Sequence, residues 1–239
     1  MMMPLPIDNN EIQSLYYSTI GKGVRSIAIT SPHIGAGVSM IAYALSRRAA
    51  AAGKKALLID FNLMNAGIGE SLALPRTEWG LKNGDSTDNA LTSISDTGLS
   101  ILTAPKKIAG HWEFKERDSL KEKFKIFLKE FDVIIIDTAP LLDDEVCENI
   151  PSLSVCGACE EALMVVLSGR TVESDIIESY KKLKQVGAKL SGTIINDRYS
   201  SNIADELCRE ISRIEDYFPS IALYLKDKVR NSVFLNQRI

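Results

Sequence analysis

The stretch that decides the fold is Val24-Arg25-Ser26-Ile27-Ala28-Ile29-Thr30, followed directly by Ser31-Pro32-His33-Ile34-Gly35-Ala36-Gly37-Val38-Ser39-Met40. The first part is typical of a buried strand, and a helical pattern follows the second. A glycine-rich turn between the two lets backbone N–H groups converge on phosphate oxygens at the positive end of a helix. We therefore expect a nucleotide-phosphate site made by Gly35, Ala36, Gly37, Val38, Ser39 and Met40. Because glycines are also common at strand-to-helix turns, this stretch alone leaves a purely structural alternative open.

Two further strand patterns end in a carboxylate. Ala56-Leu57-Leu58-Ile59 runs into Asp60, and Val133-Ile134-Ile135-Ile136 runs into Asp137. In a parallel sheet both side chains emerge at the carboxyl edge, beside the glycine-rich turn. Ser39 and Asp137 would supply the hard oxygen ligands that Mg²⁺ prefers. The structural alternative is that Asp begins turns after strands.

Apolar runs alternate with helical periods along the chain. The predicted strands are Val24–Thr30, Lys55–Asp60, Leu99–Ala104, Phe131–Asp137, Ala162–Leu167 and Ser191–Asn196. Three helices are predicted: one from Val38 to near Gly53, one over Lys115–Glu130, and one over Val172–Val186. The last has an apolar stripe of Ile176, Ile177, Tyr180 and Leu183. The polar stretch Trp79–Asp96 reads as a loop with a short helix. This order predicts an α/β fold: a doubly wound, mostly parallel sheet with helices on both faces.

Composition excludes several classes of protein. The chain has 239 residues, of which 45% are hydrophobic, and a net charge of −3, which argues against a nucleic-acid partner. No signal peptide and no run of about 18 apolar residues is recognisable, so we expect a cytoplasmic protein. We expect three parts: a helical lead-in over residues 1–23, a nucleotide-binding domain over 24–198, and a helical extension over 199–239.

These motifs together resemble the deviant-Walker P-loop ATPases of the ParA/MinD group, nearest to the cytoplasmic domains of bacterial tyrosine kinases and their polysaccharide-export relatives. The resemblance covers roughly Glu11 to Asn196. It implies bound ATP or ADP with Mg²⁺, an adenine contact from Asn196, and a catalytic role for Asp60 if the protein is active. It also implies a homodimer or a heteromeric protein partner, such as a membrane protein of a polysaccharide-export system.

The departures from the family pattern concern its charged residues. Val38 stands in place of the phosphate-loop lysine, and His33 in place of the signature lysine. Asn62 and Met64 replace a second Asp and an Arg of the next motif. Since phosphoryl transfer depends on neutralising charge, losing one cation costs roughly 10³–10⁵ in rate. We expect a pseudo-ATPase with weakened nucleotide and Mg²⁺ binding that regulates or assembles a membrane-associated system such as exopolysaccharide export.

Two other functions stay open at this point. One is an active ATPase completed by a lysine or arginine from a dimer mate or partner. The other is a chromosome or cell-pole positioning factor. Lys22, Arg25, Lys54 and Lys55 are the cations near in sequence; we expect Arg25, Lys54 and Lys55 to lie at the far edge of the sheet, where they cannot substitute for the lysine. For His33 we favour a plain loop role.

Two remaining features have structural interpretations. Cys156 and Cys159, with Cys147 upstream, suggest a metal site, but buried structural thiols are the favoured reading. The segment after Asn196 predicts one helical face of Ile203, Leu207, Ile211, Ile214 and Phe218, capped by Ser201 or Asn202 and broken by Pro219, and then an amphipathic stretch, Ile221–Val229. We expect these helices to pack on the domain or a partner, with peripheral membrane contact as the alternative.

Overall fold

The computed structural model describes residues 5–63, 67–81, 87, 89–94, 97–106, 112–143, 149–198, 203–215 and 218–232. The chain forms two compact units, Met1–Asn196 and Asp197–Ile239. Met64, Cys147, Ser201 and Asn202, to which the sequence predictions refer, lie outside the described residues.

The first unit is built on a sheet that has seven strands in the described residues, in the order β3-β4-β2-β5-β1-β6-β7. All neighbouring strands are parallel except the edge pair of β3 and β4. The strands are β1 (Ser26–Thr30), β2 (Ala56–Asp60), β3 (Leu91–Ile94), β4 (Leu99–Leu102), β5 (Val133–Asp137), β6 (Glu161–Leu167) and β7 (Leu190–Asn196). The predicted doubly wound α/β fold is confirmed.

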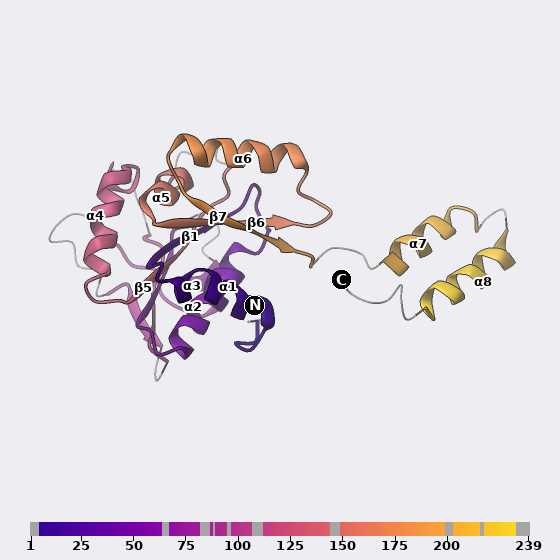
Figure 1. Cartoon of the computed structure of the whole chain (residues 1–239), viewed down its shortest axis with the longest axis horizontal. Coiled ribbons are helices and arrows are strands. Elements are labelled where there is room, and N and C mark those ends of the chain that lie inside the picture. Colours follow the sequence, from indigo (N-terminus) through magenta and orange to yellow (C-terminus); the bar gives the residue numbers. More distant parts are fainter. Residues whose placement is uncertain are drawn as a thin grey trace. The chain divides into compact units, whose positions relative to one another are not determined.

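Helices cover both faces of this sheet (Figure 1). One face carries α1 (Asn10–Ser18), α2 (Val38–Ala51) and α3 (Gly67–Ser71), with a short 3-10 turn at Ile20–Lys22. The other face carries α4 (Arg117–Phe127), α5 (Ser152–Ala158) and α6 (Glu173–Gln185), with a second 3-10 turn at Trp112–Phe114. The central strands are buried along their whole length, so they read as continuous apolar runs rather than alternating ones.

Two predictions for the first unit were wrong. Trp79–Asp96 contains strand β3, and its described residues contain no helix. The polar Thr92 and Ser93 hid this strand, which is a partly exposed edge strand whose Leu91 and Ile94 pack on the two core clusters.

The prediction of which α6 side chains are buried was also partly wrong. Leu183 is fully buried, but Ile177 and Tyr180 are 44% and 49% exposed. The second buried position is the small polar Ser179. Because only Ser179 and Leu183 of α6 are buried, the neighbouring apolar side chains Ile177 and Tyr180 remain exposed to solvent.

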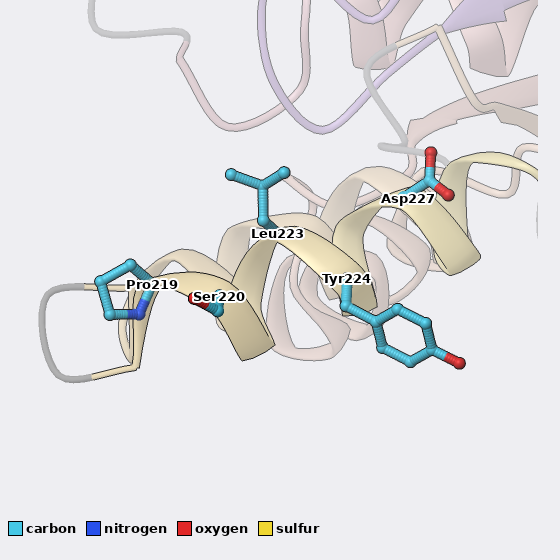
Figure 2. A pocket seen from close by; sticks show the side chains of 5 residues that line it. All are labelled: Pro219, Ser220, Leu223, Tyr224 and Asp227. Carbon is cyan, nitrogen blue, oxygen red and sulfur yellow. The ribbon is translucent and has the colours of Figure 1, made fainter.

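The second unit is a pair of helices in contact, α7 (Ile203–Ser212) and α8 (Pro219–Arg230). The predicted first helix extended to Phe218, but α7 ends at Ser212, so Ile214 and Phe218 lie beyond it. Pro219 is the first residue of α8, where its fixed φ suits a helix start. An open hollow of about 520 Å³ lies on α8 (Figure 2), lined by Pro219, Ser220, Leu223, Tyr224 and Asp227.

In the part of the chain that the structure describes, no helix combines the length and the apolar character that crossing a membrane requires.

Candidate functional site

The glycine-rich turn has the backbone geometry of a phosphate loop. Gly35 and Gly37 have φ of +84° and +93°, a region that glycine enters without steric cost. Gly37 is the N-cap of α2 and no side chain caps this helix, so its first N–H groups remain available at the positive end of the helix dipole. The predicted binding residues Gly35 to Met40 therefore form a strand–turn–helix cradle.

Asn196 lies directly over this loop. Its side-chain amide Nδ2 donates a hydrogen bond of 2.8 Å to the carbonyl oxygen of Ala36. A Cβ atom added to Gly37 would lie only 2.7 Å from the same nitrogen. The fold thus brings the end of β7 to the phosphate loop, 160 residues away in sequence. An adenine contact from Asn196 remains a prediction.

Asp60 and Asp137 are neighbours across the pairing of β2 and β5. Both residues are fully buried. One carboxylate oxygen of Asp60 and both oxygens of Asp137 have no hydrogen-bond partner; the other oxygen of Asp60 accepts the Asn62 N–H. Such groups are costly unless a cation compensates them.

The electrostatics of this pair follow from burial without compensation. Burial raises the pKa of Asp60 to about 7, although the Asn62 N–H and the charge of Arg76 oppose the rise. Burial, and then the neighbouring Asp60, raise the pKa of Asp137 well above its ordinary value. The Ser39 hydroxyl lowers that pKa somewhat, so Ser39 faces Asp137, but it does not complete a well-formed hydrogen bond to either oxygen. Two buried carboxylates with unpartnered oxygens beside a serine hydroxyl are a donor set that suits Mg²⁺.

Arg76 is a cation that the sequence reasoning missed. Its guanidinium donates hydrogen bonds to the backbone carbonyls of Ala104, Leu63 and Pro105, at 3.2, 3.4 and 2.7 Å. It lowers the pKa of Asp60 without forming an ion pair with it. No motif marks this arginine, because its position depends on loops that only the fold brings together.

Val38 is partly buried and carries no charge. Its side chain packs against the core cluster that lies under α2. The expectation that Arg25 lies at the opposite edge is confirmed, since its guanidinium donates to the carbonyls of Leu128, Phe131 and Asp132, around the start of β5. Lys22 acts electrostatically on Glu161 at the start of β6. None of these side chains replaces the missing phosphate-loop lysine.

His33 is more than a plain loop residue. Its ring lies between the carboxylates of Asp143 and Asp175, at 2.6 and 3.1 Å. Sequence reasoning did not single out either aspartate, because Asp143 follows β5 in an irregular segment and Asp175 belongs to α6. The only sequence signal was the position of His33 in the loop.

Cys156 and Cys159 lie on the face of the sheet opposite to α2. Cys156 is buried in α5, where burial raises the pKa of its thiol to about 12, and Cys159 follows at the end of that helix. Both belong to or pack against the core cluster of that face. Among the described residues no group of three or more His, Cys, Asp or Glu side chains is placed to hold a metal ion.

Comparison with known proteins agrees with this geometry. No family model matches the chain. It is 26% identical over 192 residues to the tyrosine-protein kinase YwqD of Bacillus subtilis (strain 168), covering 77% of each protein. Among solved structures, the chimerical protein CapA2B2 superposes with a TM-score of 0.67 at 24% identity, covering 77% of this chain and 82% of that one. The septum site-determining protein MinD of Pyrococcus horikoshii OT3, complexed with Mg-ADP, superposes with a TM-score of 0.58 at 22% identity, covering 74% and 72%.

The two structural matches bear on the fold alone, whereas the match to YwqD is one of sequence along most of both chains. The structural matches show that the chain shares the fold of MinD and CapA2B2, and the sequence match shows that a bacterial tyrosine-protein kinase is among its homologues.

Proposed function

We propose that this protein binds Mg²⁺ and ATP or ADP at the loop of residues 35–40 but hydrolyses little or none of it. In this proposal Ser39 and Asp137 hold Mg²⁺, the loop holds the phosphates, and Asn196 meets the base. Asp60 would be the catalytic carboxylate if any turnover remains. The domain limits at residues 24 and 199 are part of the same proposal.

The observation that carries this proposal is the contrast between the two halves of the site. Its anionic half is intact, because Asp60 and Asp137 are buried with unpartnered oxygens, as an absent cation would leave them. Its cationic half is changed, because an uncharged, partly buried Val38 stands in the loop and His33 is engaged by two carboxylates. Backbone N–H groups and Mg²⁺ support binding, while charge neutralisation in the transition state is weakened.

The biological role that we propose is regulation or assembly of a membrane-associated system such as exopolysaccharide export, through a second copy of the chain or a protein partner. Its support is the sequence similarity to a bacterial tyrosine-protein kinase. The proposal places the protein at the membrane through that partner.

A phosphate-release assay with Mg-ATP tests the proposal. We expect the native protein to turn over ATP at the background rate of Asp137→Ala. Val38→Lys restores the missing cation and serves as the positive comparison. Mg²⁺-dependent turnover by the native chain that Asp137→Ala abolishes would refute the pseudo-ATPase.

A second candidate is an ATPase completed in trans. The retained pair of buried carboxylates, Asp60 and Asp137, favours it, since they are kept beside a loop that lacks its own lysine. This candidate requires turnover per molecule to rise with protein concentration or on adding a partner. Background turnover over a hundredfold range of concentration would count against it for a homodimer.

A further inference from the structure

Three segments meet at the imidazole ring of His33. The ring belongs to the phosphate loop, Asp143 to the segment after β5, and Asp175 to the first turn of α6. Nδ1 lies 2.6 Å from one oxygen of Asp143, and Nε2 lies 3.1 Å from one oxygen of Asp175. The three side chains are 43%, 34% and 23% exposed, so the cluster lies at the surface and is accessible to a ligand.

Asp143 also binds the loop backbone. Its second carboxylate oxygen accepts the N–H of Ile34 at 2.7 Å, next to Gly35. One carboxylate therefore satisfies a backbone N–H of the loop and a ring nitrogen of His33 together. This is the pattern of contacts that a phosphate oxygen makes with such a loop, here supplied by a side chain of the same protein.

The charges around the ring strengthen this arrangement. The charged groups that face His33 are Asp143, from the segment after β5, and Asp175, from α6. Their hydrogen bonds and charges raise the pKa of His33, against a smaller opposite effect of burial. The ring therefore keeps its proton to a higher pH than a free imidazole, and in that form its two N–H donors match the two carboxylate acceptors.

We propose that Asp143 is an internal competitor for nucleotide phosphate, held on the phosphate loop by His33 and Asp175. This inference rests on the proposed nucleotide site and adds its regulation. A polyphosphate that reaches the loop beside Ile34 displaces the Asp143 carboxylate, and His33 then exchanges one anion for another. His33 and Asp143 are positioning residues, and the Asp143 carboxylate leaves the Ile34 N–H when the loop is occupied.

The first test needs no nucleotide. The chain has two histidines, so a His111→Gln variant assigns the His33 signals in an NMR titration. We expect a His33 pKa above 6.5, which falls on Asp143→Asn and on Asp175→Asn, and faster amide exchange at Ile34 in Asp143→Ala. An unshifted His33 pKa, or an Ile34 exchange rate that Asp143→Ala leaves unchanged, would overturn the inference.

The second test measures the competition by calorimetry with Mg-ADP. Because a charge-assisted hydrogen bond is removed from the competing state, Asp143→Ala should bind about tenfold more tightly than the native protein. We expect the affinity of the native protein for Mg-ADP to change with pH as the His33 ring titrates. His33→Lys keeps a permanent cation, so its affinity should lose that dependence.

The outcomes separate the two proposals. Equal or weaker binding by Asp143→Ala, with clear binding by the native protein, overturns the competition and leaves the nucleotide site. Absence of Mg-ADP binding in the native protein, Asp143→Ala and His33→Lys rejects the nucleotide site itself, and the competition with it.

Discussion

Replacing Asp60 by Asn should remove a measurable part of the stability that this protein loses on going from acid to neutral pH; the buried Asp137, whose pKa is also raised, contributes to the same loss. The pKa of Asp60 is raised from its ordinary 3.8 to about 7 in the folded chain. A raised pKa means that the folded state holds the proton more tightly, so the stabilisation is complete below pH 3.8 and is lost as the pH rises through 7. The full loss corresponds to about 4 kcal/mol, of which about 2.5 kcal/mol falls between pH 5 and pH 8.

Urea unfolding at pH 5 and pH 8 measures this difference. The native protein should be less stable at pH 8, and Asp60→Asn should lose about 2.5 kcal/mol less between the two values. The buried amide carries its own penalty of about 1–3 kcal/mol, but this penalty is the same at both pH values and cancels in the difference.

Asp8→Asn, at an exposed site, is the matched control and should leave the pH dependence unchanged. The raised pKa of His33 contributes with the same sign, yet both variants retain it, and the loss of the charge of Asp60, which raises the pKa of Asp137, adds to the difference. An equal loss of stability in the native protein and in Asp60→Asn would refute the reasoning that Asp60 is buried without compensation.

Three further substitutions test the architecture around the site. Gly37 has φ +93°, and a Cβ added there would lie 2.7 Å from a side-chain nitrogen, so Gly37→Ala should lower the free energy of unfolding by about 2 kcal/mol or more. The control Gly53→Ala, at φ +80° but in open space, should lose less. Equal losses in the two variants would show that the close contact is unimportant. Arg76→Ala removes hydrogen bonds to three backbone carbonyls and should cost about 2 kcal/mol in urea unfolding, so an unchanged midpoint would contradict its role. Leu183→Ala should cost about 2–5 kcal/mol and Tyr180→Ala about 0.5 kcal/mol by the same measurement, and the reverse order would mean that α6 faces the sheet differently.

The fold was predictable where a strand is buried on both faces. The runs that end at Thr30, Asp60 and Asp137 are continuous and apolar, and the structure places all three at the centre of the sheet. The edge strand β3 was not predictable, because its half-exposed Thr92 and Ser93 follow no clear period. Edge strands carry this weaker pattern because only part of their surface is buried.

The candidate site was predictable only where its residues share one segment or follow a strand. The loop of residues 35–40 and the two strand-end aspartates are of this kind. Asp143 and Arg76 lie in irregular segments and Asp175 lies on a helix, so no motif marks them. Only the tertiary fold brings Asp143 and Asp175 to His33 and Arg76 near Asp60. Their roles depend on distances that no spacing in the sequence records.

The measurement that tests the central claim most directly is calorimetric titration of the purified protein with Mg-ADP, beside Val38→Lys and Asp137→Ala. The account predicts that the native protein binds, that Val38→Lys binds more tightly by about 1.5–3 kcal/mol, and that Asp137→Ala loses the Mg²⁺ dependence. No binding by the native protein up to millimolar Mg-ADP would contradict the account, and a gain by Val38→Lys alone would show that the loop keeps its shape without its ligand.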